Sequence, residues 1–181
     1  MALSSLLFVV GCANAVERGH NTALDSVDLV KMTNDMAERI VADPEVQAVL
    51  AREPMRVVVQ PVENRMTAEI MPRGPAEAFT ARVRTLLAKH APNQFVWVMN
   101  KGAYDRLRDR ELEGVELGPA PAAVNPEYAL TATFSSLTSE DPRRRSAYYL
   151  CVYELTDLAR RNVLWTGSYE VKKLAVKGFL D

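Results

Sequence analysis

The chain has 181 residues, of which 48% are hydrophobic and 25% are charged, and its formal net charge is −1 at pH 7. This near-neutral balance excludes general electrostatic binding of nucleic acid or anionic membranes, and only two cysteines are present, which excludes a disulfide framework. The length is sufficient for one domain with its own core, and no stretch of the sequence approaches the apolar length that spans a bilayer.

A short apolar run over residues 3–12 ends in small residues directly before Cys12. This pattern is typical of a bacterial lipoprotein signal, which is cut before a cysteine whose sulfur then carries diacylglycerol. We therefore predict a signal peptide over residues 1–11 and a lipidated Cys12, although no Lys or Arg precedes the run. The next residue is Ala13 rather than Asp, which favours sorting to the outer membrane in Gram-negative lipoproteins. The alternative is an N-terminal strand or helix with an incidental buried cysteine.

Residues 12–25 are predicted to be the lipidated cysteine followed by a short tether, because they are small and polar and show no periodicity. Residues 26–181 are predicted to form a single periplasmic domain. A first helix is expected to begin near Ser26, which is a plausible N-cap. Asp43 and Pro44 predict the start of a second, shorter helix, with a capping carboxylate followed by proline at the first helical position.

The middle of the chain alternates strand and helix patterns. A β-branched run over residues 56–62 predicts a strand, and residues 64–67 leave it as a turn. Apolar spacing predicts a helix over residues 76–90, a short strand over 95–98 and a further helix over 101–112. Three apolar side chains of this last helix are expected to turn inward: Tyr104, Leu107 and Leu112.

Three strands are predicted over residues 128–137, 147–157 and 163–173, and their spacing indicates an antiparallel meander. The middle strand is apolar on both faces, which suits a central position in the sheet. The expected fold class is α/β (α+β): a single mixed sheet of about five strands with a C-terminal antiparallel meander, packed by three to four helices on one or both faces.

The sequence offers little chemistry. Its two histidines, His20 and His90, have no carboxylates at ligand spacing, and no nucleophile elbow, phosphate-binding loop or dinucleotide fingerprint is present. Cys151 sits inside an apolar strand pattern, which favours a structural role over a nucleophilic one. We therefore expect no catalytic residue, no metal and no cofactor, and we interpret the chain as a binding or regulatory module.

Two regions are candidates for contact with a partner. Arg143, Arg144 and Arg145 form a charge cluster in a predicted hairpin loop, which either is a solvated loop tip or contacts an acidic surface. Thr131 and Thr133 lie on the more polar face of the first meander strand, which is the second candidate.

Several segments, taken in order, resemble the outer-membrane lipoproteins that activate bifunctional penicillin-binding proteins. The strongest are Tyr148-Tyr149-Leu150, Leu155-Thr156-Asp157-Leu158 and Val163-Leu164-Trp165, which match a Tyr-rich strand, a Leu-x-Asp turn and an Ile/Val-x-Trp strand. Upstream, residues 57–65 resemble the first strand of that family and its exit turn, and residues 128–136 resemble its third strand. With Cys12, the resemblance covers nearly the whole chain.

The resemblance implies a small domain similar to the curli-secretion lipoprotein and to the N-terminal domain of the Tol propeller protein. It also implies a lipid-anchored protein on the periplasmic face of the outer membrane, which docks on a bifunctional peptidoglycan synthase and stimulates it. The partner would then be this synthase or another envelope protein, with the membrane reached through the anchor and no nucleic acid involved. The alternative is a non-catalytic lipoprotein component of an envelope assembly or secretion machine of the curli-secretion type.

Overall fold

A computed structural model describes residues 16–19, 22–66, 73–114 and 123–176. These ranges contain four helices and seven strands. The helices are α1 (Ser26–Ala42), α2 (Pro44–Leu50), α3 (Arg73–His90) and α4 (Lys101–Glu111). The strands are β1 (Val16–Gly19), β2 (Met55–Val59), β3 (Glu63–Arg65), β4 (Phe95–Val98), β5 (Tyr128–Glu140), β6 (Arg144–Asp157) and β7 (Asn162–Val176).

All seven described strands belong to one mixed sheet, with the order β1-β7-β6-β5-β2-β4 and with β3 beside β5. The long strands β5, β6 and β7 form the predicted antiparallel meander, with β6 at its centre. The other pairs are parallel: β1 with β7, β2 with β5 and β4, and β3 with β5. The predicted fold class, an open mixed sheet with a C-terminal meander and helices, is confirmed.

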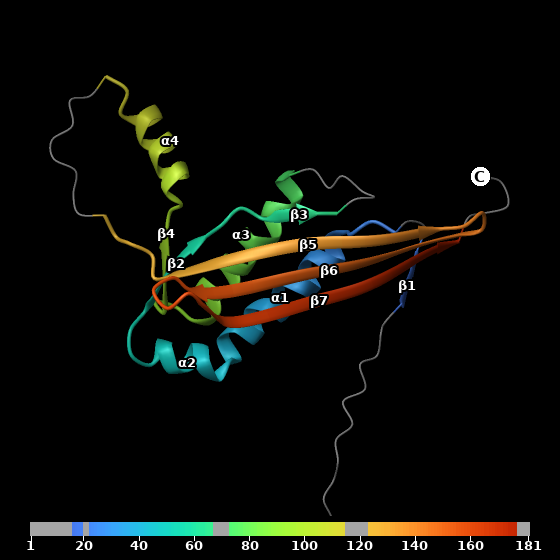
Figure 1. The fold of residues 1–181 in the computed structure, drawn as a ribbon, viewed down its shortest axis with the longest axis horizontal. Helices are drawn as coiled ribbons and strands as arrows, with labels where there is room; N and C mark the ends of the chain where they lie inside the picture. Colours follow the sequence, from blue (N-terminus) through green and yellow to red (C-terminus); the bar gives the residue numbers. More distant parts are fainter. Residues whose placement is uncertain (1–15, 20–21, 67–72, 115–122, 177–181) are drawn as a thin grey trace, which may run out of the picture.

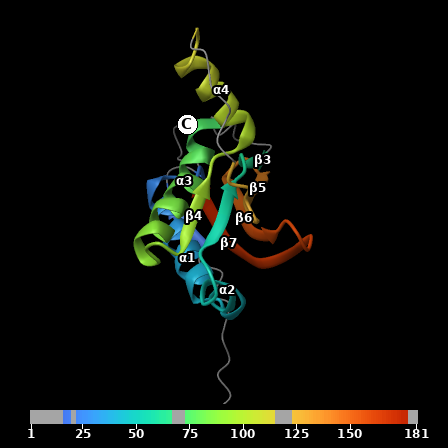
Figure 2. The ribbon, with the colours of Figure 1, turned by 90° about the vertical axis from the view of Figure 1, so that its left-hand side faces the viewer.

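Helices α1 and α3 pack against each other behind the sheet as it is viewed in Figure 1. Among the described residues, no helix covers the opposite face of the meander. Figure 2, which looks along the sheet, shows the helical layer on one side and the strands on the other. The strands β5, β6 and β7 also extend past the helices, so one end of the meander projects from the body (Figure 1).

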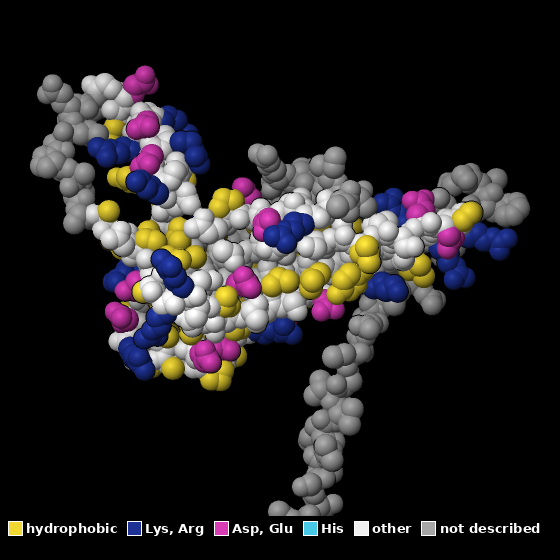
Figure 3. Space-filling model, viewed as in Figure 1, with side chains coloured by type: hydrophobic (Ala, Val, Ile, Leu, Met, Phe, Trp, Pro, Cys, Tyr) yellow, Lys and Arg dark blue, Asp and Glu magenta, His cyan; other side chains and the backbone are white. Residues whose placement is uncertain are grey.

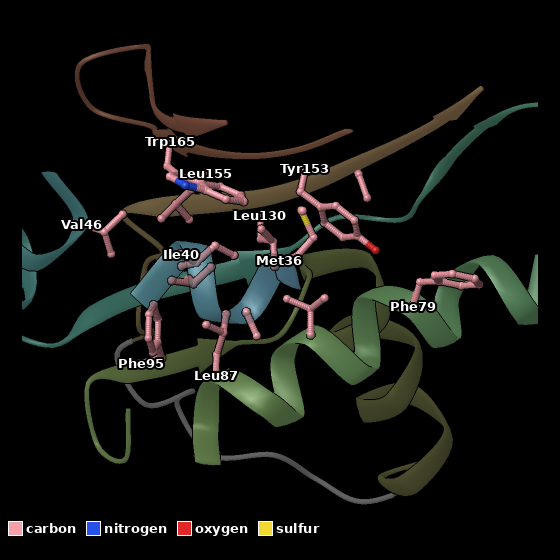
Figure 4. Close-up of a cluster of buried hydrophobic side chains, with 14 of the residues drawn as sticks. Met36, Ile40, Val46, Phe79, Leu87, Phe95, Leu130, Tyr153, Leu155 and Trp165 are labelled. Carbon is pink, nitrogen blue, oxygen red and sulfur yellow. The ribbon is translucent and has the colours of Figure 1, made fainter. Parts of the chain in front are cut away.

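The hydrophobic core lies between this helical layer and the covered face of the sheet (Figure 4). Alternate residues of the strands point into it, because successive side chains of a strand point to opposite faces. The strands contribute Met55, Val57, Phe95, Leu130, Phe134, Tyr153, Leu155 and Trp165, and the helices contribute Met32, Met36, Ile40, Val46, Leu50, Phe79, Val83 and Leu87. The rings of Phe79 and Phe134 meet edge-on at 5.2 Å between centroids, which joins α3 to β5.

Two short strands were not predicted. β1 lies within the segment interpreted as a tether, and β3 lies where a turn was expected. Both pair with a long neighbour through the backbone, Val16 with Lys172 and Glu63 with Thr133. All three residues of β3 are exposed, so no apolar alternation marks it in the sequence. Such strands are invisible to a method that reads side-chain patterns.

The first helix begins at a different cap from the one predicted. Asp25, rather than Ser26, is the N-cap, and its Oδ1 accepts hydrogen bonds from the backbone N–H groups of Val27 and Asp28 at 2.7 and 3.1 Å. Asp28 Oδ2 in turn accepts the N–H of Asp25 at 2.8 Å, which completes a capping box. The second helix begins as predicted, with Asp43 as its cap and Pro44 at its first position.

The prediction that Tyr104, Leu107 and Leu112 face the core is wrong. These side chains are 47%, 38% and 37% exposed, and every residue of α4 is at least partly exposed in the part of the chain that the structure describes. The reason is the position of the helix: α4 leaves the end of β4 and projects away from the sheet (Figure 1). Its apolar residues therefore meet no core surface among the described residues.

Candidate functional site

The first candidate surface is the face of the meander opposite the helices, which we call the open face. The register of the three strands fixes its residues, because every second position points away from the core. β5 contributes Thr131, Thr133, Ser135 and Leu137, β6 contributes Tyr148, Leu150, Val152 and Glu154, and β7 contributes Thr166, Ser168, Glu170 and Lys172.

An apolar stripe runs along the middle of the open face. Its members are Leu137, Tyr148, Leu150 and Val152, which pair across β5 and β6 or follow one another along β6. Leu137 is 73% exposed, and the other three side chains are half-buried. Figure 3 shows hydrophobic side chains gathered in a band along the strands, with charged groups at its margins. A continuous exposed apolar patch with a polar rim is the usual mark of an interaction surface.

Polar groups flank the stripe on both sides. On the β3 side, Glu63 and Arg65 form an ion pair at 2.8 Å. On the β7 side, a hydrogen bond to Glu170 raises the pKa of the Tyr148 hydroxyl, with burial adding to the effect. Tyr148 therefore stays neutral and keeps a donor directed to a carboxylate at the edge of the stripe. The arrangement combines an apolar centre with oriented polar groups, as protein interfaces do.

The sequence-predicted contact residues occupy two separate places. Thr131 and Thr133 lie on the open face beside Glu154 and Val152 of β6. The arginine cluster, Arg143 to Arg145, lies at the β5–β6 turn, where Asp141 Oδ1 accepts the backbone N–H groups of Arg143 and Arg144 at 2.8 Å each. Nine residues of extended strand separate Thr131 from the last residue of β5, which is about 30 Å. The structure does not bring the two predicted regions together.

The apolar stripe was not predicted as a contact surface from the sequence. The sequence does contain a signal for this surface. β6 is apolar on both faces, whereas the helices form a single layer that can cover only one face of the sheet. The pattern predicts a central strand, which is confirmed because β6 lies between β5 and β7, but the described helices cover only one face of the meander. The residues that carry the surface are therefore Leu137, Leu150 and Val152 as much as the threonines.

Cys151 is placed as expected for a structural residue. Its side chain is 1% exposed and packs in the core beside the ring of Phe134, its partner across the β5–β6 pair. Burial raises the pKa of the thiol to about 12, so the thiolate that a nucleophile requires is absent near neutral pH.

Within the described ranges, no group of histidine, cysteine and acidic residues is arranged to hold a metal ion. The same part of the chain contains no helix that combines the length and the apolar character needed to cross a bilayer. Cys12 and the predicted signal peptide over residues 1–11 lie outside the described residues. The described part defines a class of protein: an α+β domain whose meander is covered by helices on one face and carries an apolar stripe on the other.

Comparison with known families agrees with this class. Residues 28–171 match the model of the family described as peptidoglycan-synthase activator LpoB, and the chain belongs to this family. The resemblance inferred from the sequence is therefore confirmed. The family consists of regulatory outer-membrane lipoproteins that activate peptidoglycan synthesis, rather than of catalytic enzymes.

Solved structures that resemble part of this chain include two LpoB C-terminal domains. That from Escherichia coli is 16% identical, with a TM-score of 0.44, over 77% of this chain and 94% of that chain. That from Salmonella enterica is 16% identical, with a TM-score of 0.42 and the same coverage. The lipoprotein GNA1162 from Neisseria meningitidis is 14% identical, with a TM-score of 0.39, over 66% of this chain and 83% of that chain. No curated protein sequence matches the chain significantly. The family assignment rests on the family model.

Proposed function

We propose that this protein is anchored to the outer membrane through Cys12 and that it binds and stimulates a bifunctional penicillin-binding protein. The family match over residues 28–171 is the observation that carries this proposal. The open face supports it, since an activator without a catalytic site must act through a contact surface. The synthase would be stimulated in its glycosyltransferase and transpeptidase activities by this contact.

We also propose that the domain sits close to the membrane. β1 begins at Val16 and pairs with β7, so only the residues between Cys12 and Val16 remain to separate the anchor from the sheet. The four residue-to-residue steps from Cys12 to Val16 span at most about 14 Å when fully extended. The synthase must then reach toward the outer membrane, instead of the activator reaching across the periplasm.

The anchor can be tested by counting reactive thiols in the mature protein. The native protein should not react with a thiol reagent at pH 8, because Cys151 is buried and burial raises its pKa to about 12. After unfolding, one thiol per chain should react, although the sequence contains two cysteines, because acylation blocks Cys12. A Cys12→Ser variant should keep that one thiol and lose acyl-chain labelling. Two reactive thiols in the unfolded mature protein would contradict lipidation.

For the synthase contact, we propose the open-face stripe and its flanking residues Thr131 and Thr133. The stripe offers an apolar centre that a partner can desolvate, and the threonines offer hydrogen bonds at its margin. The exposed guanidinium groups of Arg143 and Arg144 at the β5–β6 turn would contact acidic groups of the partner outside this centre. On this arrangement the stripe contributes most of the affinity, and the arginines contribute less because they remain solvated.

Replacing Leu150 with arginine should abolish stimulation of the synthase. The substitution places a charge at the centre of the stripe, on the side of the sheet away from the core, so the fold is retained while an unpaired charge must be desolvated on binding. The full-length chain in detergent would be assayed for glycan polymerisation by each bifunctional synthase of the organism. We expect binding at least about tenfold weaker, which corresponds to the energy of one buried interface side chain.

Val30→Arg is the matched control, because Val30 is 44% exposed on α1, on the other side of the molecule. It should bind and stimulate like the wild type. If the Leu150 variant is folded and still stimulates fully, the open face is not the contact surface. If the wild type stimulates none of the synthases, the proposed role itself is wrong.

A further inference from the structure

A groove lies at the base of α4, far along the sheet from the β5–β6 turn. It has a volume of about 370 Å³ and is lined by the end of β2 and the residues after it, one side of α3, the end of β4 and the first turns of α4. Its apolar lining comes from Val59, Val62, Trp97 and Met99. We call it the α4 groove, and Figure 2 shows β2, β4, α3 and the base of α4 converging there.

Two arginines line the α4 groove, Arg84 from α3 and Arg106 from α4. Neither forms an ion pair with any residue in the described ranges. Glu77 is the one acidic side chain that lines the groove in this part of the chain. The balance of charge is therefore positive, with guanidinium groups that have donors to offer.

The first turn of α4 faces the same groove through Asn100 and Ala103. A helix N-terminus carries partial positive charge and prefers an acidic side chain nearby, but the first turn of α4 contains none. Arg106 Nη1 instead lies 3.6 Å from the position that a Cβ on Gly102 would take. A cation thus lies close to the positive end of the helix, where Asn100 Oδ1 caps one N–H group by accepting from Gly102 at 3.1 Å. An anion in the groove would interact favourably with both the guanidinium group and the helix N-terminus.

The side chain of Thr80 is a further indication that the α4 groove binds a ligand. Thr80 lines the groove from α3, its side chain is only 3% exposed, and its hydroxyl has no hydrogen-bond partner among the described residues. Buried hydroxyls are normally paired, and leaving one unpaired is unfavourable. A ligand that accepts a hydrogen bond would remove this cost.

We propose that the α4 groove binds an acidic, extended peptide segment of a protein partner, with a carboxylate between Arg84, Arg106 and the start of α4. A carboxylate matches the forked donors of arginine, and apolar neighbours in the peptide match Val59, Val62 and Trp97. The apolar lining favours a peptide over a free phosphate, and Glu77 repels a doubly charged phosphate more than a single carboxylate. β4, at the end of the described strand order, offers an adjacent edge for an extended chain. This site is separate from the open face and goes beyond the activator role proposed above.

Peptide binding can be followed through the NMR signal of the Trp97 indole N–H. The chain contains two tryptophans, and a Trp97→Phe variant identifies which of the two signals belongs to Trp97. The full-length chain in detergent would be titrated with acetyl-Val-Asp-Val-Asp-Leu-amide and, separately, with the same peptide carrying Asn for Asp. The acidic peptide should shift the Trp97 signal, and the Asn peptide should not. Each of Arg84→Gln and Arg106→Gln should weaken binding about tenfold, as expected for loss of a charge-assisted hydrogen bond.

Arg110→Gln is the matched control, since Arg110 lies on the same helix but pairs with Glu111 and does not line the groove. It should bind the acidic peptide like the wild type. Equal shifts with both peptides, no shift with either, or equal losses in all three arginine variants would overturn the proposal. Inorganic phosphate is the remaining arm: if it shifts Trp97 and displaces the peptide at the same concentration, the site takes phosphate and the peptide assignment is wrong.

Discussion

Replacing Lys173 with methionine should lower the free energy of unfolding by about 3–5 kcal/mol, the usual cost of leaving a buried charge without its partner. Lys173 is 5% exposed, and its Nζ lies 2.5 Å from Asp28 Oδ2, whose residue is fully buried. The same ammonium donates to the carbonyl of Ala23 at 2.8 Å and to Asp25 Oδ2 at 3.2 Å. Three acceptors thus satisfy the three donors of the ammonium group, and they join β7 to the start of α1.

A second variant separates the effect of the Lys173 charge from the effect of its packing. In Lys173→Met combined with Asp28→Asn, the buried charge is gone while the Asn oxygen can still accept the N–H of Asp25. The double variant should therefore be about 1–2 kcal/mol more stable than Lys173→Met alone in urea unfolding. Lys172→Met, on the open face, is the control and should change stability by less than about 0.5 kcal/mol. If the double and single variants unfold at the same urea concentration, the ammonium does not neutralise a buried charge.

The contacts of Lys173 with Asp28 and Asp25 also make the free energy of unfolding depend on pH. Burial lowers the pKa of Lys173, but its bonds to Asp28 and Asp25 outweigh this effect and raise it above the usual 10.5. The stabilisation that Lys173 provides is fully present below the pKa of this group in the unfolded chain. It is lost as the pH rises through the pKa of Lys173 in the folded protein. Burial raises the pKa of Asp25, but the Asp28 N–H and Lys173 outweigh it and lower the pKa below 3.8. That contribution is lost as the pH falls through the folded pKa of Asp25.

Much of the fold was predictable because its elements carry side-chain patterns. The meander, the core-facing side of β5 and the Asp43-Pro44 helix start all follow from alternation or capping residues. Val163 is 46% exposed, although simple alternation along β7 would place it on the same buried face as Trp165. A register irregularity between Leu155 and Thr156 places Val163 opposite Thr156 while Trp165 stays opposite Leu155. A bulge of this kind depends on pairing between strands and leaves no local signature.

The two surfaces were less predictable than the fold. A surface depends on which elements are left uncovered, and the outward projection of α4 cannot be inferred from its amphipathic spacing. The α4 groove draws residues from β2, α3, β4 and α4, which are up to 47 positions apart from Val59 to Arg106. Thr80 and Trp97 carry no signal for it in the sequence, since each fits the pattern of its own helix or strand. Only the packing of the four elements brings them together.

Replacing Gly167 with alanine should destabilise the fold by about 1–3 kcal/mol, the typical cost of overpacking a core. A Cβ at this position would lie 2.5 Å from both Cη2 and Cζ2 of Trp165 and 3.3 Å from Met36 Sδ. Carbon atoms in contact normally lie about 3.5–4.0 Å apart. Trp165 is 6% exposed and packs in the core, so its ring cannot swing away without opening the interface between β7 and α1.

The physical cause can be isolated by a double-mutant cycle measured in urea. Trp165→Leu is itself destabilising, but once the ring is absent, adding Gly167→Ala should cost little, which gives a coupling of about 1–3 kcal/mol. Gly102→Ala is the control, because the nearest atoms to its added Cβ lie at 3.6 Å; it should not lower stability, since alanine favours a helix over glycine by about 0.5–1 kcal/mol. Equal costs of Gly167→Ala with and without the Trp165 ring would mean that the ring does not require glycine there. The glycine at position 167 would then need a purely conformational explanation.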